Sequence, residues 1–302
     1  MTLQKFLGSV SILFVLFLTI PAGAQDYFAP HNILKFADYL YRQGDYRRSA
    51  AEYQRYLITV GANDSVFYSA ALAYKMARNL TAAETYFSEI PREFGGSPLL
   101  SRAYLQMGFL WVVRDARRRM ASFKKVRLAE LNPVSTRQAL QTIFGVPFLI
   151  HYQFARAGTY YHSLNAPGFS PQEIPFVRKF ETLAAEGAKI KEKNPWAAGF
   201  LSAIVPGLGR FYVGRPGDGL YSMLFIGISG FSAYRGFARQ GIQSGRGWIL
   251  GGLTSALYLG NVYGSYLSAK IMNQKRKDDF RTQVILQLDL WHSAHRLDDP
   301  VR

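Results

Sequence analysis

The sequence predicts an all-α protein in which a solenoid of helical hairpins is followed by a glycine-rich transmembrane helical hairpin. Two observations lead to this fold class. Residues 36–57 and 70–91 align at a shift of 34 residues, and 16 of the 27 glycines lie between residues 199 and 264. The 302-residue chain also has no cysteine, which excludes a disulfide framework, a cysteine-ligated metal and a cysteine nucleophile.

Residues 1–24 have the pattern of an export signal. Lys5 precedes an apolar run from Phe6 to Ile20, and small residues follow Pro21 up to Ala24. A retained anchor is the alternative, but about 15 apolar residues form a helix of roughly 22 Å, shorter than the ~30 Å core of a bilayer. We therefore expect cleavage after Ala24, with the next residues outside the cytoplasm.

Residues 25–192 are predicted to form a helical repeat domain. Each aligned segment contains a helix, a short turn at 44–45 or 78–79, and a second helix. The matched positions are Ala37 with Ala71, Leu40 with Tyr74, Tyr46 with Leu80, Ser49 with Ala83, and Tyr53 with Phe87. Small residues lie where the two helices of a hairpin must touch. An unrelated helical bundle is the alternative.

This pattern resembles the tetratricopeptide repeat family over residues 31–91. A third unit, over residues 99–126, departs from it at the basic residues 117–119 and 124–125. In that family the first helix of each repeat lines a concave groove that usually binds an extended peptide. The resemblance implies a partner-binding groove lined by Asp38, Tyr41, Arg42, Tyr68, Leu72 and Lys75. The alternative for Tyr41 and Tyr68 is ordinary packing.

Residues 193–270 are predicted to form a membrane domain, because residues 194–277 contain one acidic residue against nine Lys and Arg. We expect spans at about 218–236 and 247–269, and a re-entrant or interfacial hairpin at 196–215 that Pro206 interrupts. The turn motif is Pro206, Gly207, Gly209, Tyr212, Gly214 and Arg215. It resembles a small domain with two transmembrane helices. The motif lacks the Lys and Ser/Thr of a nucleotide-binding loop.

The second span carries small residues at intervals of four: Gly252, Ala256, Gly260, Gly264 and Ser268. Small residues on one stripe let two helices approach closely in lipid, so we predict a helix-packing ridge there. Residues 271–302 are predicted to form a basic tail. Two spans return this tail to the outer side, whereas three spans, which require residues 196–215 to cross, place it in the cytoplasm.

The residues indicate a binding protein and not an enzyme. The sequence has no nucleophile elbow and no zinc-ligand pair on a helix beyond His292 and His295, which lack further ligands. We predict no cofactor and no metal. With the chain exported as predicted, its net charge of +16 favours anionic lipid head groups, acidic cell-wall polymers or acidic proteins over nucleic acid.

The expected function is that of a non-enzymatic, membrane-anchored bacterial envelope protein whose repeats bind or scaffold a protein or peptide partner. Its expected location is the bacterial inner membrane, with the repeat domain on the periplasmic side. The alternative is a small oligomeric pore or transport accessory, formed by self-association through the glycine-rich spans.

Overall fold

The computed structural model describes residues 29–126, 128, 131–164 and 168–300, and these residues form helices and connecting segments with no strand. The predicted signal at 1–24 lies outside them. The chain divides into two compact units, Met1–Leu110 with Asp298–Arg302, and Trp111–Leu297. This division differs from the predicted domain boundary at residue 192.

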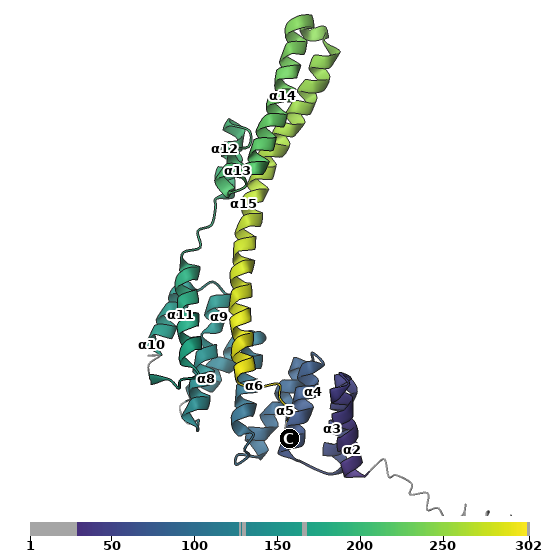
Figure 1. The fold of residues 1–302 in the computed structure, drawn as a ribbon, viewed down its shortest axis with the longest axis vertical. Coiled ribbons are helices and arrows are strands. Elements are labelled where there is room, and N and C mark those ends of the chain that lie inside the picture. The colour runs from purple at the N-terminus through teal and green to yellow at the C-terminus, as the bar shows by residue number, and fades with distance from the viewer. Residues whose placement is uncertain (1–28, 127, 129–130, 165–167, 301–302) are drawn as a thin grey trace, which may run out of the picture. The chain divides into compact units, whose positions relative to one another are not determined.

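The first unit contains α2 (Pro30–Arg42), α3 (Tyr46–Thr59), α4 (Asp64–Met76), α5 (Leu80–Glu93) and most of α6 (Leu100–Val113). Helices α3, α4 and α5 each pack on the helix that precedes them in the sequence, which gives a solenoid-like arrangement (Figure 1). Asp45, Asn63 and Asn79 cap α3, α4 and α5 by accepting a hydrogen bond from a backbone N–H three residues later. The helices predicted within 36–57 and 70–91 are therefore present.

The turns of the two hairpins share one backbone conformation. Gly44 ends the α2–α3 turn with φ +79°, and Arg78 occupies the equivalent position, 34 residues later, with φ +64°. Glycine adopts this left-handed conformation at little cost, whereas an arginine is strained there. The turn geometry therefore follows the 34-residue shift even where the residue type does not.

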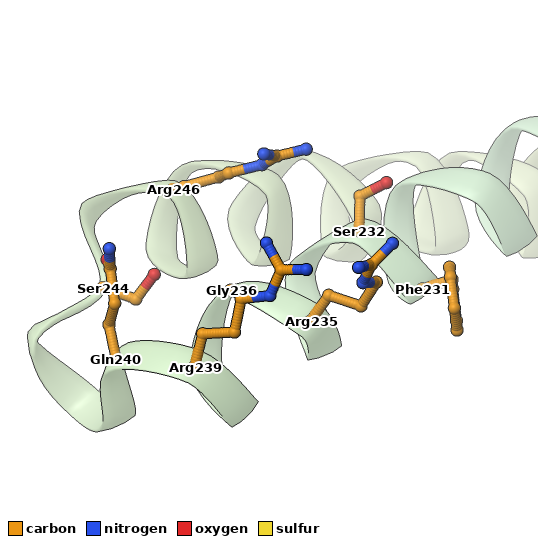
Figure 2. Close-up of a pocket in the computed structure, with 8 residues that line it drawn as sticks. All are labelled: Phe231, Ser232, Arg235, Gly236, Arg239, Gln240, Ser244 and Arg246. Atoms are coloured by element: carbon orange, nitrogen blue, oxygen red, sulfur yellow. The ribbon is translucent and has the colours of Figure 1, made fainter.

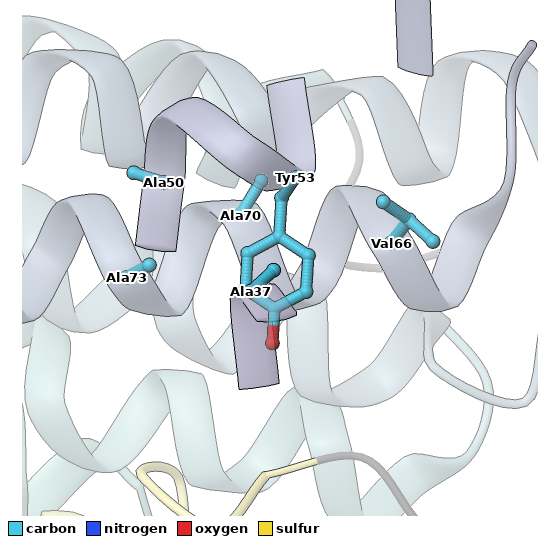
Figure 3. Packing of buried hydrophobic residues seen from close by; sticks show 6 residues of the cluster. All are labelled: Ala37, Ala50, Tyr53, Val66, Ala70 and Ala73. Atoms are coloured by element: carbon cyan, nitrogen blue, oxygen red, sulfur yellow. The ribbon is translucent and has the colours of Figure 1, made fainter. Parts of the chain in front are cut away.

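The core of this unit is built from small residues around aromatic ones. Ala37, Ala50, Val66, Ala70 and Ala73 surround Tyr53, which is 4% exposed (Figure 3). Alanines at these contacts let the helix backbones approach closely, and the aromatic ring fills the remaining space. At the positions 34 residues after Ala37, Ser49 and Tyr53, the residues Ala71, Ala83 and Phe87 are also fully buried.

The second unit begins with α7 (Arg117–Val126), α8 (Val134–Phe144), α9 (Val146–Ile150), α10 (Phe154–Ser163) and α11 (Ile174–Ala188). Helix α10 packs against α11, where Tyr161 stacks on Phe180 with 5.6 Å between the ring centroids. Both side chains are fully buried.

The unit continues with α12 (Pro195–Ile204), α13 (Leu208–Val213), α14 (Pro216–Gln240), η3 (Gly241–Gln243) and α15 (Gly245–Ala294). Helices α14 and α15 form an antiparallel hairpin, and α12 and α13 pack against α15 (Figure 1). Helix α15 extends into the predicted tail at 271–302 as far as Ala294, because residues 265–294 contain no glycine or proline and continue the helix.

The predicted spans at 218–236 and 247–269 lie within α14 and α15. Among the described residues, no helix has both the length and the apolar character needed to cross a membrane.

The predicted packing ridge is wrong for the contact between α14 and α15. Gly252, Ala256 and Gly260 are exposed, and a Cβ atom added at Gly252 or Gly260 would meet no atom within 4 Å. At about 100° per residue, a four-residue interval turns about 40° further around the helix at each step. Only the last two members, Gly264 and Ser268, reach packed surroundings; Gly264 lies beside Arg210.

The inward-facing stripe of α15 instead follows a seven-residue spacing, which turns only about 20° per step. Gly247, Asn261 and Ser268 are buried, and Thr254 is half-buried. Thr254 donates a hydrogen bond to Ser229 of α14, with 2.9 Å between the hydroxyl oxygens. The small-residue contact between the helices therefore exists, but on a different face from the predicted one.

Candidate ligand-binding groove

The six residues of the predicted groove come from α2 and α4 and differ in exposure. Tyr68 and Leu72 are 0% and 1% exposed, so Tyr68 is a packing residue, as the alternative held. Tyr41 is half-buried, and Asp38 and Arg42 are exposed. Asp38 accepts a hydrogen bond from the Tyr53 hydroxyl, which connects α2 to α3.

Lys75 is the centre of the site. Its side chain is only 9% exposed, although a buried lysine costs free energy unless it is paired. Its Nζ donates to Gln106 Oε1 at 2.9 Å and to Asp298 Oδ1 at 2.7 Å, and lies 5.1 Å from the ring centroid of Phe109. Burial lowers the pKa of Lys75, and Asp298 partly opposes that shift.

Three further groove residues come from α6, and the sequence interpretation missed them. Arg102 lies 5.0 Å from the ring centroid of Tyr68, and Gln106 donates to the Tyr68 hydroxyl at 3.5 Å. Adding the same 34-residue shift to Tyr68, Leu72 and Lys75 gives Arg102, Gln106 and Phe109. The 34-residue shift therefore points to these three residues, but the irregular sequence of the third repeat obscured it.

A non-helical acidic segment of the same unit, residues 298–300, contacts the residues of the predicted groove. Asp298 pairs with Lys75, and Arg102 donates through a terminal nitrogen to the backbone carbonyl of Asp299 at 2.6 Å. Burial raises the pKa of Tyr41 to about 12, and the charge of Asp298 contributes to that shift. The site therefore binds a carboxylate between a lysine, aromatic rings and an arginine.

The turn motif forms the junction of α12 and α13. Gly207, with φ +87°, precedes α13, and Gly214, with φ +91°, follows it. Gly209 lies inside α13, where a Cβ atom would be 1.9 Å from the Ala198 carbonyl oxygen. Pro206 lies just before Gly207, and the Gly207 N–H donates to Asn261 Oδ1 of α15 at 3.1 Å. The glycines thus serve turn geometry at two positions and close packing at a third.

Tyr212 and Arg215 complete the motif. The Tyr212 hydroxyl accepts a hydrogen bond from the Asn194 backbone N–H at 3.2 Å, and Lys193 Nζ lies 4.6 Å from its ring centroid. Arg215 forms an ion pair with Asp218 at the start of α14. These contacts fix the ends of the α12–α13 hairpin.

A cationic cavity of about 330 Å³ lies where α14 and α15 are joined. Arg235, Arg239 and Arg246 line it together with Ser244 (Figure 2). Ser244 is buried and accepts a hydrogen bond from the Gly247 backbone N–H at 3.1 Å, which caps α15. This cavity gathers positive charge at one end of the hairpin.

A buried acid–histidine pair connects α15 to the start of α11. His295 Nε2 lies 2.7 Å from Glu173 Oε1, and Trp291 Nε1 donates to Glu173 Oε2 at 3.2 Å. Glu173 is 1% exposed. Across the described residues, no cluster of three or more potential ligands could hold a metal ion. We interpret the pair as a structural contact.

Comparisons with known proteins identify no relatives. A scan against protein-family models found no match, and searches of curated proteins and of solved structures found none either. The function must therefore be argued from the geometry of the groove residues and of the cationic cavity.

Proposed function

We propose that this protein is a non-enzymatic, membrane-anchored scaffold of the bacterial envelope, whose helical hairpins bind a segment of a protein partner. The observation that carries the proposal is the groove across α2, α4 and α6. It presents Lys75 and Arg102 beside aromatic rings and accommodates a non-helical acidic segment.

The buried lysine supports a binding role for this surface. An apolar residue of similar volume at position 75 would pack without the cost of burying an ammonium group. Lys75 instead donates to two side chains and faces the ring of Phe109. Such an arrangement selects a carboxylate, because a neutral ligand would leave the ammonium group without a counter-charge.

Outward-facing apolar side chains on α12, α14 and α15 support membrane anchoring. We call this surface the apolar belt, and six of its members are between 64% and 75% exposed: Trp196, Phe200, Phe225, Ile228, Ile249 and Leu259. Exposed apolar surface of this extent is typical of contact with lipid or with another protein. We propose that the belt contacts acyl chains and that the hairpin inserts into the bilayer.

The arginines at the end of the hairpin suit the boundary of such a membrane. Arg235 and Arg239 follow the part of α14 that carries the belt. Arg246 precedes the part of α15 that carries it. Guanidinium groups bind phosphate oxygens well, so these residues would lie among lipid head groups. With the predicted signal removed, the helical repeats lie on the periplasmic side of the inner membrane.

Capture of partners from detergent-solubilised membranes tests the scaffold. The wild-type chain and the matched control Lys35→Met, which removes an exposed lysine of α2, should retain a stoichiometric protein partner. Lys75→Met keeps the aliphatic stem but removes the charge, and should lose that partner. Conductance of the purified protein in bilayers, with no partner retained, would favour the pore instead.

Flotation with vesicles tests the membrane contact. The full chain should float with phosphatidylcholine vesicles, and more completely when phosphatidylglycerol is added. Replacing Arg235, Arg239 and Arg246 by Gln should reduce the effect of phosphatidylglycerol more than replacing the exposed Arg47, Arg178 and Arg281 by Gln. Equal effects of the two triple variants would mean that only net charge matters, and no flotation would contradict anchoring.

A further inference from the structure

We infer that the acidic segment, residues 298–300, is an intramolecular ligand that keeps the groove occupied, and that a partner must displace it with an Asp or Glu of its own. The inference rests on the proposed function, since it concerns the same groove. It adds the chemical class of the partner segment and a mechanism that regulates access.

The contacts separate what the groove recognises by charge from what it recognises by backbone. Lys75 pairs with the side chain of Asp298, whereas Arg102 donates to the main-chain carbonyl of Asp299. Every residue type has that carbonyl, so this hydrogen bond fixes the position of the chain without reading the residue. The groove therefore selects a segment in which one carboxylate is followed by any residue with an accessible carbonyl.

The structure also indicates that the contact is exchangeable. The Asp298 side chain is 50% exposed, while that of Lys75 is 9% exposed, so the ion pair joins a buried ammonium group to a carboxylate that solvent reaches. Residues 298–300 belong to no helix, so releasing them breaks no helical hydrogen bond. A segment of the same chain competes with a free ligand at an effective concentration that the geometry of its tether sets.

The competition has a direct consequence for an incoming peptide. Its apparent dissociation constant equals the intrinsic one divided by the fraction of molecules whose groove is free. Removing the Asp298 charge weakens occupation, because the desolvated ammonium group of Lys75 then prefers the charged ligand supplied from solution. Asp299 offers a matched control, since its recognised atom is the backbone oxygen and not the carboxylate.

The test uses the full chain and a fluorescent peptide of residues 296–302 as the probe, followed by fluorescence anisotropy. Asp298→Asn should bind the peptide about tenfold more tightly than wild type, because a hydrogen bond to a charged group is typically worth about a factor of ten or more. Asp299→Asn should behave as wild type. Combining Lys75→Met with Asp298→Asn should abolish the gain.

Equal, measurable affinity in wild type, Asp298→Asn and Asp299→Asn would show that the segment does not compete, and would overturn the inference while the groove stands as a binding site. Absence of binding to Asp298→Asn would also overturn it, because the segment would then be no ligand. Partner capture with Lys75→Met, described above, decides the proposed function separately from either result.

Discussion

Gly209 lies in a close contact between α12 and α13, and Gly209→Ala should open this contact. A Cβ atom there would lie 1.9 Å from the Ala198 carbonyl oxygen and 2.6 Å from Ser202 Oγ. The Ala198 carbonyl belongs to a helix and cannot rotate away. The two helices must therefore separate by more than an ångström.

The cost follows from these contacts. Overpacking of a close contact typically costs 1–3 kcal/mol, that is, about 2 kcal/mol. The Gly209 N–H also donates to Ser202 Oγ at 2.9 Å, and losing this bond costs roughly 1 kcal/mol more. The higher helix propensity of alanine offsets about 1 kcal/mol of this destabilisation. The net destabilisation is about 2 kcal/mol, which corresponds to about a thirtyfold change in an opening equilibrium.

A single thiol measures this opening. Ala269 is fully buried with Ala198 and Val213, and the chain has no native cysteine, so Ala269→Cys provides a local reporter. Its alkylation rate should rise about thirtyfold in Gly209→Ala. Gly260→Ala is the matched control, because an added Cβ meets nothing within 4 Å and alanine favours the helix. An unchanged rate in Gly209→Ala, or an equal rise in Gly260→Ala, would refute the argument.

The remaining predictions concern a turn, a buried amide and a titration. Arg78→Gly should raise the free energy of unfolding by about 1 kcal/mol, and Gly44→Ala should lower it similarly, both measured by urea denaturation. Asn261→Leu should speed alkylation of the thiol reporter, because Asn261 bonds two backbone groups whose loss leaves them unsatisfied at about 1–3 kcal/mol each; an unchanged rate would contradict this. Lys75 has a pKa lowered from 10.5, so its proton is lost, and the acidic segment released, as pH rises through that lowered value. Between that lowered pKa and 10.5, Lys75 carries its proton in the unfolded chain but not in the folded one. The contribution of Lys75 to stability therefore increases with pH across this range. Protection of the residue 298 and 299 amides, measured relative to their intrinsic base-catalysed exchange rate, should fall with the release, and protection that is unchanged across alkaline pH would contradict it.

Much of the first unit was predictable because the residues that repeat at an interval of 34 are the ones that pack the helices together. Ala37 and Ala71 must be small for helices to touch, so their spacing fixed the hairpins before any contact was known. The contribution of α6 to the groove was harder to predict. Arg102 and Gln106 do not resemble Tyr68 and Leu72 in chemistry, and only the 34-residue register connects them.

The packing face of α15 was not predictable from small residues alone. Glycines occur on several faces of this helix, and a stripe at intervals of four is easy to recognise, but it winds around the axis. The observed face contains Thr254, Asn261 and Ser268 as well as Gly247. Which of these stripes faces inward depends on polar contacts with α12, α13 and α14, and those contacts arise only when the distant helices are brought together.

The same register separates residues that pack one hairpin on the next from residues that lie in the predicted groove. Where one hairpin faces the next, the first two repeats use the same kinds of residue, such as Tyr53 and Phe87. Where the first helices face the groove, the residue changes from Tyr41 to Lys75 and then to Phe109. A solenoid that only needed to stack would place an apolar residue at all three positions, since a buried ammonium group adds cost and no packing. The departure at Lys75 therefore calls for a counter-charge in the groove, and Asp298 supplies it within the chain.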